Sequence, residues 1–191
     1  MAFARPRVSL ARAIVPLLCA IAGLAHSQDP RKDGEWPMAA RDYANTRYSP
    51  LADITPANAA QLKPVITFST GVLRGHEAAP LVVGNTMFLV TPYPNYVYAL
   101  DLTKPGAPTK WKFEPRPNAS SQGVACCDVV NRGMAFDNGR VYFNTLDNQT
   151  IALDAGSGKE LWRTSLGDIN KGETITTTRP GPCPCPAGRT A

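Results

Sequence analysis

Short apolar runs, rich in β-branched and aromatic residues, alternate with polar turns through the middle of the chain. Runs of this kind are typical of antiparallel strands, and helical spacing is hard to find. The segments between the runs contain Asp-Asn-Gly at 137–139, Asp-Asn at 147–148 and Gly-Ser-Gly at 156–158, residues that favour tight turns. The pattern predicts an all-β fold of short antiparallel strands.

Two stretches of the chain resemble copies of one unit. Each has a glycine before a strand, an aspartate at the end of the next strand and a tryptophan further on: Gly84 and Gly139, Asp101 and Asp154, Trp111 and Trp162. The aspartates lie 53 positions apart and the tryptophans 51. A period of this size indicates the blades of a β-propeller or the coils of a solenoid, with about one four-stranded sheet in each unit.

The turn that follows the second aspartate has a definite chemistry. We expect the Asp154 carboxylate to accept hydrogen bonds from turn amides, and the glycines to supply positive φ angles. We expect each tryptophan to pack against the next sheet, with its indole N–H on a carbonyl oxygen. The alternative is that both tryptophans only fill the core. The repeat predicts a fold and by itself no function.

The two ends differ from this body. Residues 1–27 contain arginines, an apolar run over 13–24 and Ala25-His26-Ser27, the small-residue pattern that precedes cleavage of a signal peptide. A membrane anchor is the alternative, but the run is shorter than the about 20 residues needed and contains Pro16. We expect export, a mature body over 28–176, and no membrane span after cleavage.

Residues 177–191 have proline at every second position from Pro180 to Pro186 and no strand pattern. Proline lacks the donor that a sheet needs, and this composition buries little apolar surface. We expect a disordered tail that arose from a frame shift or a misplaced gene end. A natural Pro-rich tail, or a metal site at Cys183-Pro184-Cys185, is the alternative.

The formal charge of +5 comes from the ends of the chain. Arg5, Arg7 and Arg12 lie in the first segment, Arg179 and Arg189 lie in the last, and neither segment contains an acidic residue. The body is therefore neutral, whereas binding to phosphate backbones needs clustered Lys and Arg. The composition argues against a nucleic-acid partner.

Cys126 and Cys127 are the two cysteines of the body, and they are adjacent. Neither CxxCH nor paired CxxC motifs occur, so neither a covalently attached haem nor a zinc site is indicated. One peptide holds adjacent Cα atoms about 3.8 Å apart, so a disulfide between them would be strained and would need an oxidising compartment. Two reduced or separately bridged cysteines are the alternative.

Four blocks together resemble the quinoprotein methanol and ethanol dehydrogenases. They span 42–51, 73–83, 125–133 and 154–162, in the order of that family, and the resemblance covers roughly 36–176. It implies an eight-bladed β-propeller, of which this chain would supply the first two to three blades. It also implies a periplasmic enzyme that oxidises a primary alcohol with pyrroloquinoline quinone (PQQ) and passes electrons to a cytochrome c.

The same resemblance implies a cofactor site. A disulfide between Cys126 and Cys127 would lie flat against the quinone, a sound contact for polarizable sulfur. Arg132 would bind a cofactor carboxylate through two parallel hydrogen bonds, as a planar guanidinium can. The implied cofactor-binding residues are Glu77, which would pair with Arg132, the two cysteines, Val130 as a pocket wall, Arg132, and Thr176 as a hydroxyl donor.

The family also uses a Ca²⁺ or lanthanide ion and a catalytic aspartate. The resemblance places both the metal ligands and that aspartate beyond residue 176, so we assign no catalytic or metal-binding residue and expect this chain alone to be inactive. A homodimer or a small-subunit partner is compatible with the full-length form. A non-catalytic propeller scaffold of the outer-membrane assembly type and a membrane-bound sugar-oxidising quinoprotein are the alternatives, and the Cys126-Cys127 block with Arg132 argues against both.

Overall fold

The computed structural model describes residues 34–42, 44–125 and 128–176. The predicted signal peptide, Cys126, Cys127 and the Pro-rich tail lie outside these residues. Within the described part of the chain, no helix is both long and apolar enough to cross a bilayer.

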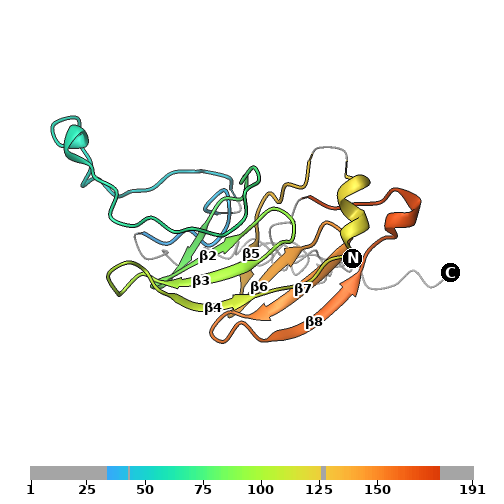
Figure 1. Ribbon diagram of the computed structural model, residues 1–191. Coiled ribbons are helices and arrows are strands. Elements are labelled where there is room, and N and C mark those ends of the chain that lie inside the picture. The colour runs from blue at the N-terminus through green and yellow to red at the C-terminus, as the bar shows by residue number, and fades with distance from the viewer. Residues whose placement is uncertain (1–33, 43, 126–127, 177–191) are drawn as a thin grey trace, which may run out of the picture. The chain divides into compact units, whose positions relative to one another are not determined.

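The described residues form two four-stranded antiparallel sheets, each with its strands in chain order (Figure 1). The first sheet contains β1 (Leu81–Val83), β2 (Thr86–Val90), β3 (Val97–Asp101) and β4 (Thr109–Phe113). The second contains β5 (Ala135–Asp137), β6 (Arg140–Asn144), β7 (Gln149–Asp154) and β8 (Glu160–Ser165). The predicted all-β fold, with one sheet in each repeat unit, is confirmed.

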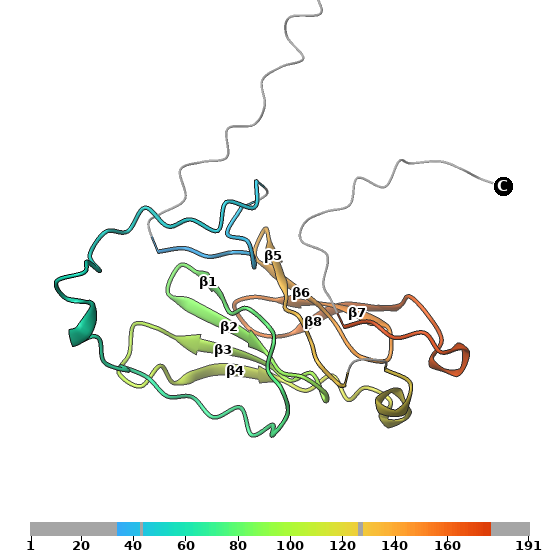
Figure 2. The ribbon, with the colours of Figure 1, turned by 90° about the horizontal axis from the view of Figure 1, so that it is seen from above.

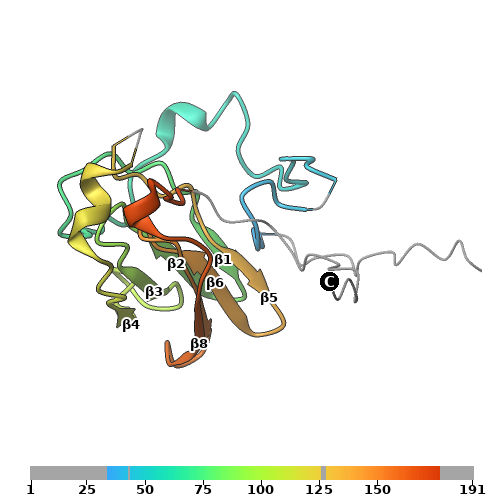
Figure 3. The same cartoon turned by 90° about the vertical axis from the view of Figure 1, so that its right-hand side faces the viewer.

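Within residues 34–42, 44–125 and 128–176, three short 3-10 helices lie outside the sheets: η2 (Ala59–Gln61), η3 (Ala119–Gly123) and η4 (Ile169–Lys171). Figure 2 shows η2 on an arm that extends away from the sheets, and residues 50–67 of this arm are all exposed. Figure 3 shows η3 and η4 beside one another near the second sheet. The helices therefore belong to the connections and leave the core to the strands.

The two sheets share one hydrophobic core. It contains Leu81, Phe88, Val90, Val97 and Ala99 from the first sheet, Val141, Phe143, Ile151 and Leu153 from the second, and Met134 just before β5. Alternate residues of β2 are buried, as a strand with one face on a core requires. Phe113 and Phe143 meet edge to face across the sheets, with ring centroids 6.1 Å apart. Neither sheet buries this face without the other.

Trp111 of β4 provides a specific contact between the sheets. Its Nε1–H donates a hydrogen bond of 3.1 Å to the carbonyl oxygen of Ala155, in the turn that follows β7. The ring lies so close to Gly158 that a Cβ atom there would be 2.6 Å from it. The expectation that a tryptophan packs against the next sheet is confirmed for Trp111, whereas its counterpart Trp162 is 42% exposed.

Asn95, in the loop between β2 and β3, provides a second contact between the sheets. Its Oδ1 accepts a hydrogen bond of 3.0 Å from the backbone N–H of Leu146, in the turn between β6 and β7. Its Nδ2 donates to the carbonyl oxygen of Thr91 within its own loop. The carboxamide is buried, so both bonds replace water that the side chain has lost.

Candidate functional site

The loop that contains the cysteine pair connects η3 to β5, and its described residues are held by both sheets. Asp128 has a φ of 62°, in the left-handed region. The carbonyl oxygen of Val129 accepts a hydrogen bond of 2.8 Å from the backbone N–H of Tyr93, in the β2–β3 loop. Val129, Val130 and Asn131 are buried. Residues 129–131 therefore follow a defined path toward Arg132.

Arg132 follows this buried stretch and is in contact with two other predicted site residues. Its backbone N–H donates to the carbonyl oxygen of Thr176 at 2.8 Å, and its Nη1 donates to the Thr176 hydroxyl at 2.6 Å. Its Nε lies 3.3 Å from Oε2 of Glu77. The structure therefore brings together Glu77, Arg132 and Thr176 from three separate segments.

The exposure of this cluster bears on what it does. The side chains of Arg132 and Glu77 are 45% and 49% exposed. Such a surface ion pair contributes only about 0–1 kcal/mol to stability. A guanidinium has five N–H donors in one plane, and the contacts with Glu77 and Thr176 use two of them. The cluster thus orients a cation whose other donors can meet a carboxylate.

The remaining predicted residues have different positions. Val130 is 4% exposed, so within the described residues its side chain is mostly packed. Its role as a pocket wall stays a prediction. Cys126 and Cys127 lie outside the described residues, so their disulfide also stays a prediction.

Asn131 directly precedes Arg132 and was given no role by the sequence reasoning. Its Nδ2 donates to the carbonyl oxygen of Asn144 at 2.9 Å, and its Oδ1 accepts from the backbone N–H of Gly133 at 3.0 Å. The side chain is 2% exposed. The signal in the sequence is a polar residue that directly follows two valines, which is easily interpreted as the start of a turn.

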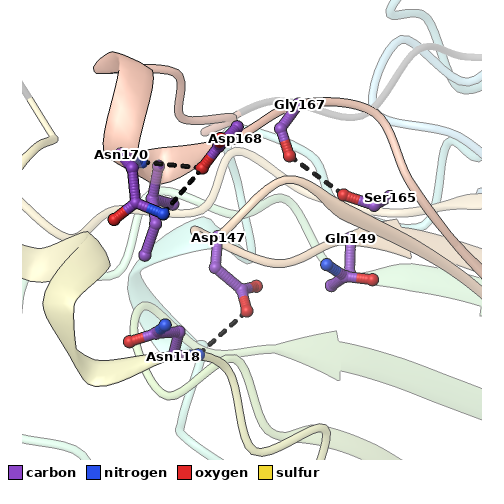
Figure 4. Close-up of a pocket in the computed structure, with 8 residues that line it drawn as sticks. Asn118, Asp147, Gln149, Ser165, Gly167, Asp168 and Asn170 are labelled. Carbon is purple, nitrogen blue, oxygen red and sulfur yellow. Dashed lines mark hydrogen bonds between the residues drawn. The ribbon is translucent and has the colours of Figure 1, made fainter.

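A hollow of about 340 Å³ lies near the end of the second sheet (Figure 4). It is lined by Asn118, Asp147, Gln149, Ser165, Gly167, Asp168, Ile169 and Asn170, and by none of the predicted site residues. Asp147 accepts a hydrogen bond from the backbone N–H of Asn118, and Asp168 accepts one from that of Asn170. Its carboxylates therefore cap backbone groups. Among the described residues no cluster of three or more His, Cys, Asp or Glu could hold a metal ion.

Comparison with known proteins gives relatives of one kind. The chain is 53% identical over 146 residues to the lanthanide-dependent methanol dehydrogenase of Methylacidiphilum fumariolicum (strain SolV), which covers 76% of this chain and 24% of that protein. It is 44% identical over 156 residues to methanol dehydrogenase [cytochrome c] subunit 1 of Paracoccus denitrificans, with 78% and 24% covered. The chain thus spans about a quarter of the length of these curated relatives.

Solved structures agree with the sequence comparison. A europium-containing methanol dehydrogenase matches with a TM-score of 0.75 and 52% identity, over 78% of this chain and 26% of that one. The quinohemoprotein alcohol dehydrogenase of Comamonas testosteroni matches with a TM-score of 0.68 and 36% identity, over 74% and 21%. The predicted propeller fold is confirmed, and the two sheets form part of such a propeller.

A family model described as "PQQ: Glucose/ethanol/alcohol dehydrogenase, beta-propeller domain" matches residues 36–163. This match contains all four sequence blocks in full and both sheets except for the last two residues of β8. By that match and by the identity to its relatives, the chain belongs to the family of PQQ-type alcohol dehydrogenase β-propellers.

Proposed function

We propose that this chain supplies part of the cofactor site of a PQQ-dependent dehydrogenase that oxidises a primary alcohol of the methanol or ethanol type. The observation that carries the proposal is the contact of Arg132 with Glu77 and Thr176. The named relatives are methanol and other alcohol dehydrogenases. Because the chain spans about a quarter of their length, the activity is proposed for the full-length polypeptide that contains it.

The described residues fit the cofactor. PQQ has three carboxylates, and a guanidinium can bind one of them through two parallel hydrogen bonds. Glu77 and Thr176 hold Arg132 from two sides, so the free edge of the guanidinium is oriented before a ligand arrives. Bound PQQ would supply the two-electron acceptor for the alcohol.

The other predicted residues complete the proposed site. Cys126 and Cys127, joined as a disulfide, would form a flat sulfur surface for the aromatic cofactor, and Val130 would close the pocket beside them. Such a disulfide needs an oxidising compartment, in agreement with the signal peptide proposed for residues 1–27. We therefore place the full-length enzyme in the periplasm.

The metal and the electron acceptor are inferred from the relatives. Two relatives are named lanthanide-dependent, and others are named for cytochrome c. We propose a lanthanide or Ca²⁺ ion and a cytochrome c acceptor for the full-length enzyme. The metal ligands and the catalytic aspartate would come from residues outside this chain.

Titration of PQQ into the full-length polypeptide, followed by quenching of tryptophan fluorescence, tests the site. We expect Arg132→Lys to weaken PQQ binding about tenfold or more, because lysine offers a point charge in place of the paired N–H donors of a guanidinium. Arg163→Lys is the matched control, since Arg163 also pairs with a carboxylate, that of Glu160 at 2.7 Å, and lies outside the proposed site. Equal affinity of Arg132→Lys and the unchanged protein would contradict the proposal.

The disulfide has its own test. Mass spectrometry of the non-reduced peptide from exported protein should show Cys126 and Cys127 joined, and changing both to Ser should weaken PQQ binding. Two free thiols in exported protein would refute the proposed sulfur surface.

The coding DNA beyond codon 176, read in all frames, tests the proposed full-length enzyme. We expect it to encode further sheets that end in tryptophan, with an acidic metal-binding cluster. If no frame does so, the chain cannot be part of the proposed enzyme.

A further inference from the structure

The buried carboxamide of Asn131 makes two hydrogen bonds that together define the backbone around Arg132. The bond from Gly133 N–H to Asn131 Oδ1 joins residues two positions apart and so spans Arg132. This arrangement is an Asx turn, in which the side chain replaces a backbone acceptor. It fixes the orientation of the peptide groups on both sides of Arg132.

The second hydrogen bond ties this turn to the second sheet. Asn131 Nδ2 donates to the carbonyl oxygen of Asn144, the last residue of β6. Asn144 is itself held, since its Oδ1 accepts a hydrogen bond of 2.8 Å from the Thr150 hydroxyl on β7. The turn that contains Arg132 is thereby tied to a pair of strands, which are more rigid than a loop.

The Asn131 carboxamide also has a structural role, because both of its hydrogen bonds are made with backbone groups. The side chain is 2% exposed and follows the buried Val129 and Val130. An apolar residue there would avoid the cost of removing a carboxamide from water, but the Gly133 N–H and the Asn144 carbonyl would then lose these two hydrogen bonds. What an apolar residue cannot do is orient the two peptide groups around Arg132.

We propose that Asn131 is a positioning residue, which directs the Arg132 guanidinium toward the place where it meets a carboxylate of the cofactor. The inference rests on the proposed function, because it assumes that Arg132 binds PQQ. Asn131 itself would touch no reacting atom. Its contribution would be to reduce the conformational freedom that Arg132 must lose on binding.

The first test compares Asn131→Ala with Thr145→Val in the full-length polypeptide. Thr145 is a suitable control because it is also buried, lies in the turn directly after β6, and loses hydrogen bonds to Asp147 and Gln149 when the hydroxyl is removed. We expect both variants to lower the unfolding temperature. Only Asn131→Ala should also weaken PQQ binding, by about tenfold, since the backbone that carries Arg132 is then less firmly fixed.

Rescue by Asn131→Asp separates positioning from general damage. A protonated aspartate can accept from Gly133 N–H and donate to the Asn144 carbonyl, whereas an ionised one cannot donate. Arg132 and Glu77 are the charged groups of the cluster next to it, and both are present in every variant. Relative to unchanged protein at each pH, the affinity of Asn131→Asp should recover as the pH falls, and that of Asn131→Ala should not.

Amide hydrogen exchange gives a readout that needs no cofactor. We expect the amide of Gly133, which loses the Asn131 acceptor, to exchange much faster in Asn131→Ala and to be unchanged in Thr145→Val. Slow exchange in Asn131→Ala, or PQQ binding as tight as in unchanged protein, would overturn the positioning role. If unchanged protein fails to bind PQQ, the proposed function fails, and the exchange rates alone then decide whether Asn131 fixes Arg132.

Discussion

Single residues determine how closely the two sheets approach. Gly158 is in the left-handed region, with a φ of 72°, and the Trp111 ring occupies the space where a side chain would begin. Glycine is needed there for two independent reasons, the backbone conformation and the lack of a Cβ. The adjacent Asp154 accepts hydrogen bonds from the backbone N–H and hydroxyl of Ser157, so the turn is fixed from both ends.

Gly158→Ala should destabilise the protein strongly. The new methyl group would clash with the indole of Trp111, and alanine is strained at this φ, so we expect a loss of about 2–4 kcal/mol in the free energy of unfolding. Urea unfolding measures it. Gly156→Ala in the same turn is the control, because its new Cβ would lie 3.5 Å from Oδ1 of Asp154, an ordinary contact. Equal losses for the two variants would refute the role given to Gly158.

The Asp154 turn also predicts a pH dependence. Hydrogen bonds from Ser157, first from its hydroxyl and then from its backbone N–H, lower the pKa of Asp154 below its ordinary value of 3.8. A lowered pKa in the folded state means that the stabilisation is present above the unfolded pKa and is lost as the pH falls through the folded pKa.

Asp154→Asn should therefore reduce the unfolding temperature at neutral pH, and the difference from unchanged protein should shrink as the pH falls below about 4. Thermal unfolding between pH 3 and pH 7 measures this. Asp137→Asn, at the exposed end of β5, is the control and should show a small difference throughout. A difference that stays constant over the whole range would exclude the ionised Asp154 as its source.

At the scale of the strands, both sheets have a shift of register at the equivalent place, between the third and the fourth strand. The ladder between β3 and β4 shifts register at Ala99/Leu100, and that between β7 and β8 shifts at Ala152/Leu153. In each case the tryptophan of the fourth strand is paired with the small alanine of the third. The alanine leaves room for the indole, which can then extend to the next sheet.

The tryptophans allow a comparison of equivalent positions. Trp111→Phe removes the hydrogen bond to Ala155 and part of the packing between sheets, so we expect a loss of about 1–2 kcal/mol in the free energy of unfolding. Trp162→Phe should cost less in this chain, because Trp162 is partly exposed. Urea unfolding of both variants checks the order, and a larger loss for Trp162→Phe would contradict the docking role of Trp111.

Strands and repeats could be predicted from the sequence because period-2 burial and turn residues are local signals. The aspartates of the two repeats lie 53 positions apart and the tryptophans 51. This difference also has a local cause, since the turn after Asp101 is longer than the one after Asp154. Contacts between distant segments leave no such signal. The pairing of Glu77 with Arg132 was expected from the family resemblance alone, and Asn131 was missed because a polar loop residue gives no sign of its burial.

At the scale of the whole described chain, one of the outer strands carries exposed apolar side chains. β8 is the last strand of the second sheet, and Leu161 and Trp162 within it and Leu166 just after it are exposed. Unpaired edges with apolar side chains are sites of association. The matched part is about a quarter of the relative's length, which leaves ample sequence to cover these side chains in a complete propeller.

The 191-residue chain by itself should therefore self-associate as its concentration rises. Leu161→Lys should reduce this, because a charge on an edge strand opposes pairing with another chain. Leu73→Lys is the matched control, since Leu73 is 99% exposed but lies in a loop away from β8. Sedimentation velocity distinguishes the two, and equal suppression by both would show that net charge is responsible.

The docking of Trp111 has a consequence for biosynthesis. Each sheet is made of consecutive residues, so its strands can pair in the order in which they emerge from the ribosome or are exported. The indole at 111, however, finds its acceptor only when the turn at 155–158 has emerged, more than forty residues later. During that interval the indole of Trp111 lacks its hydrogen-bond acceptor and its packing partner. A chaperone that binds aromatic side chains would compete for it until the second sheet has formed.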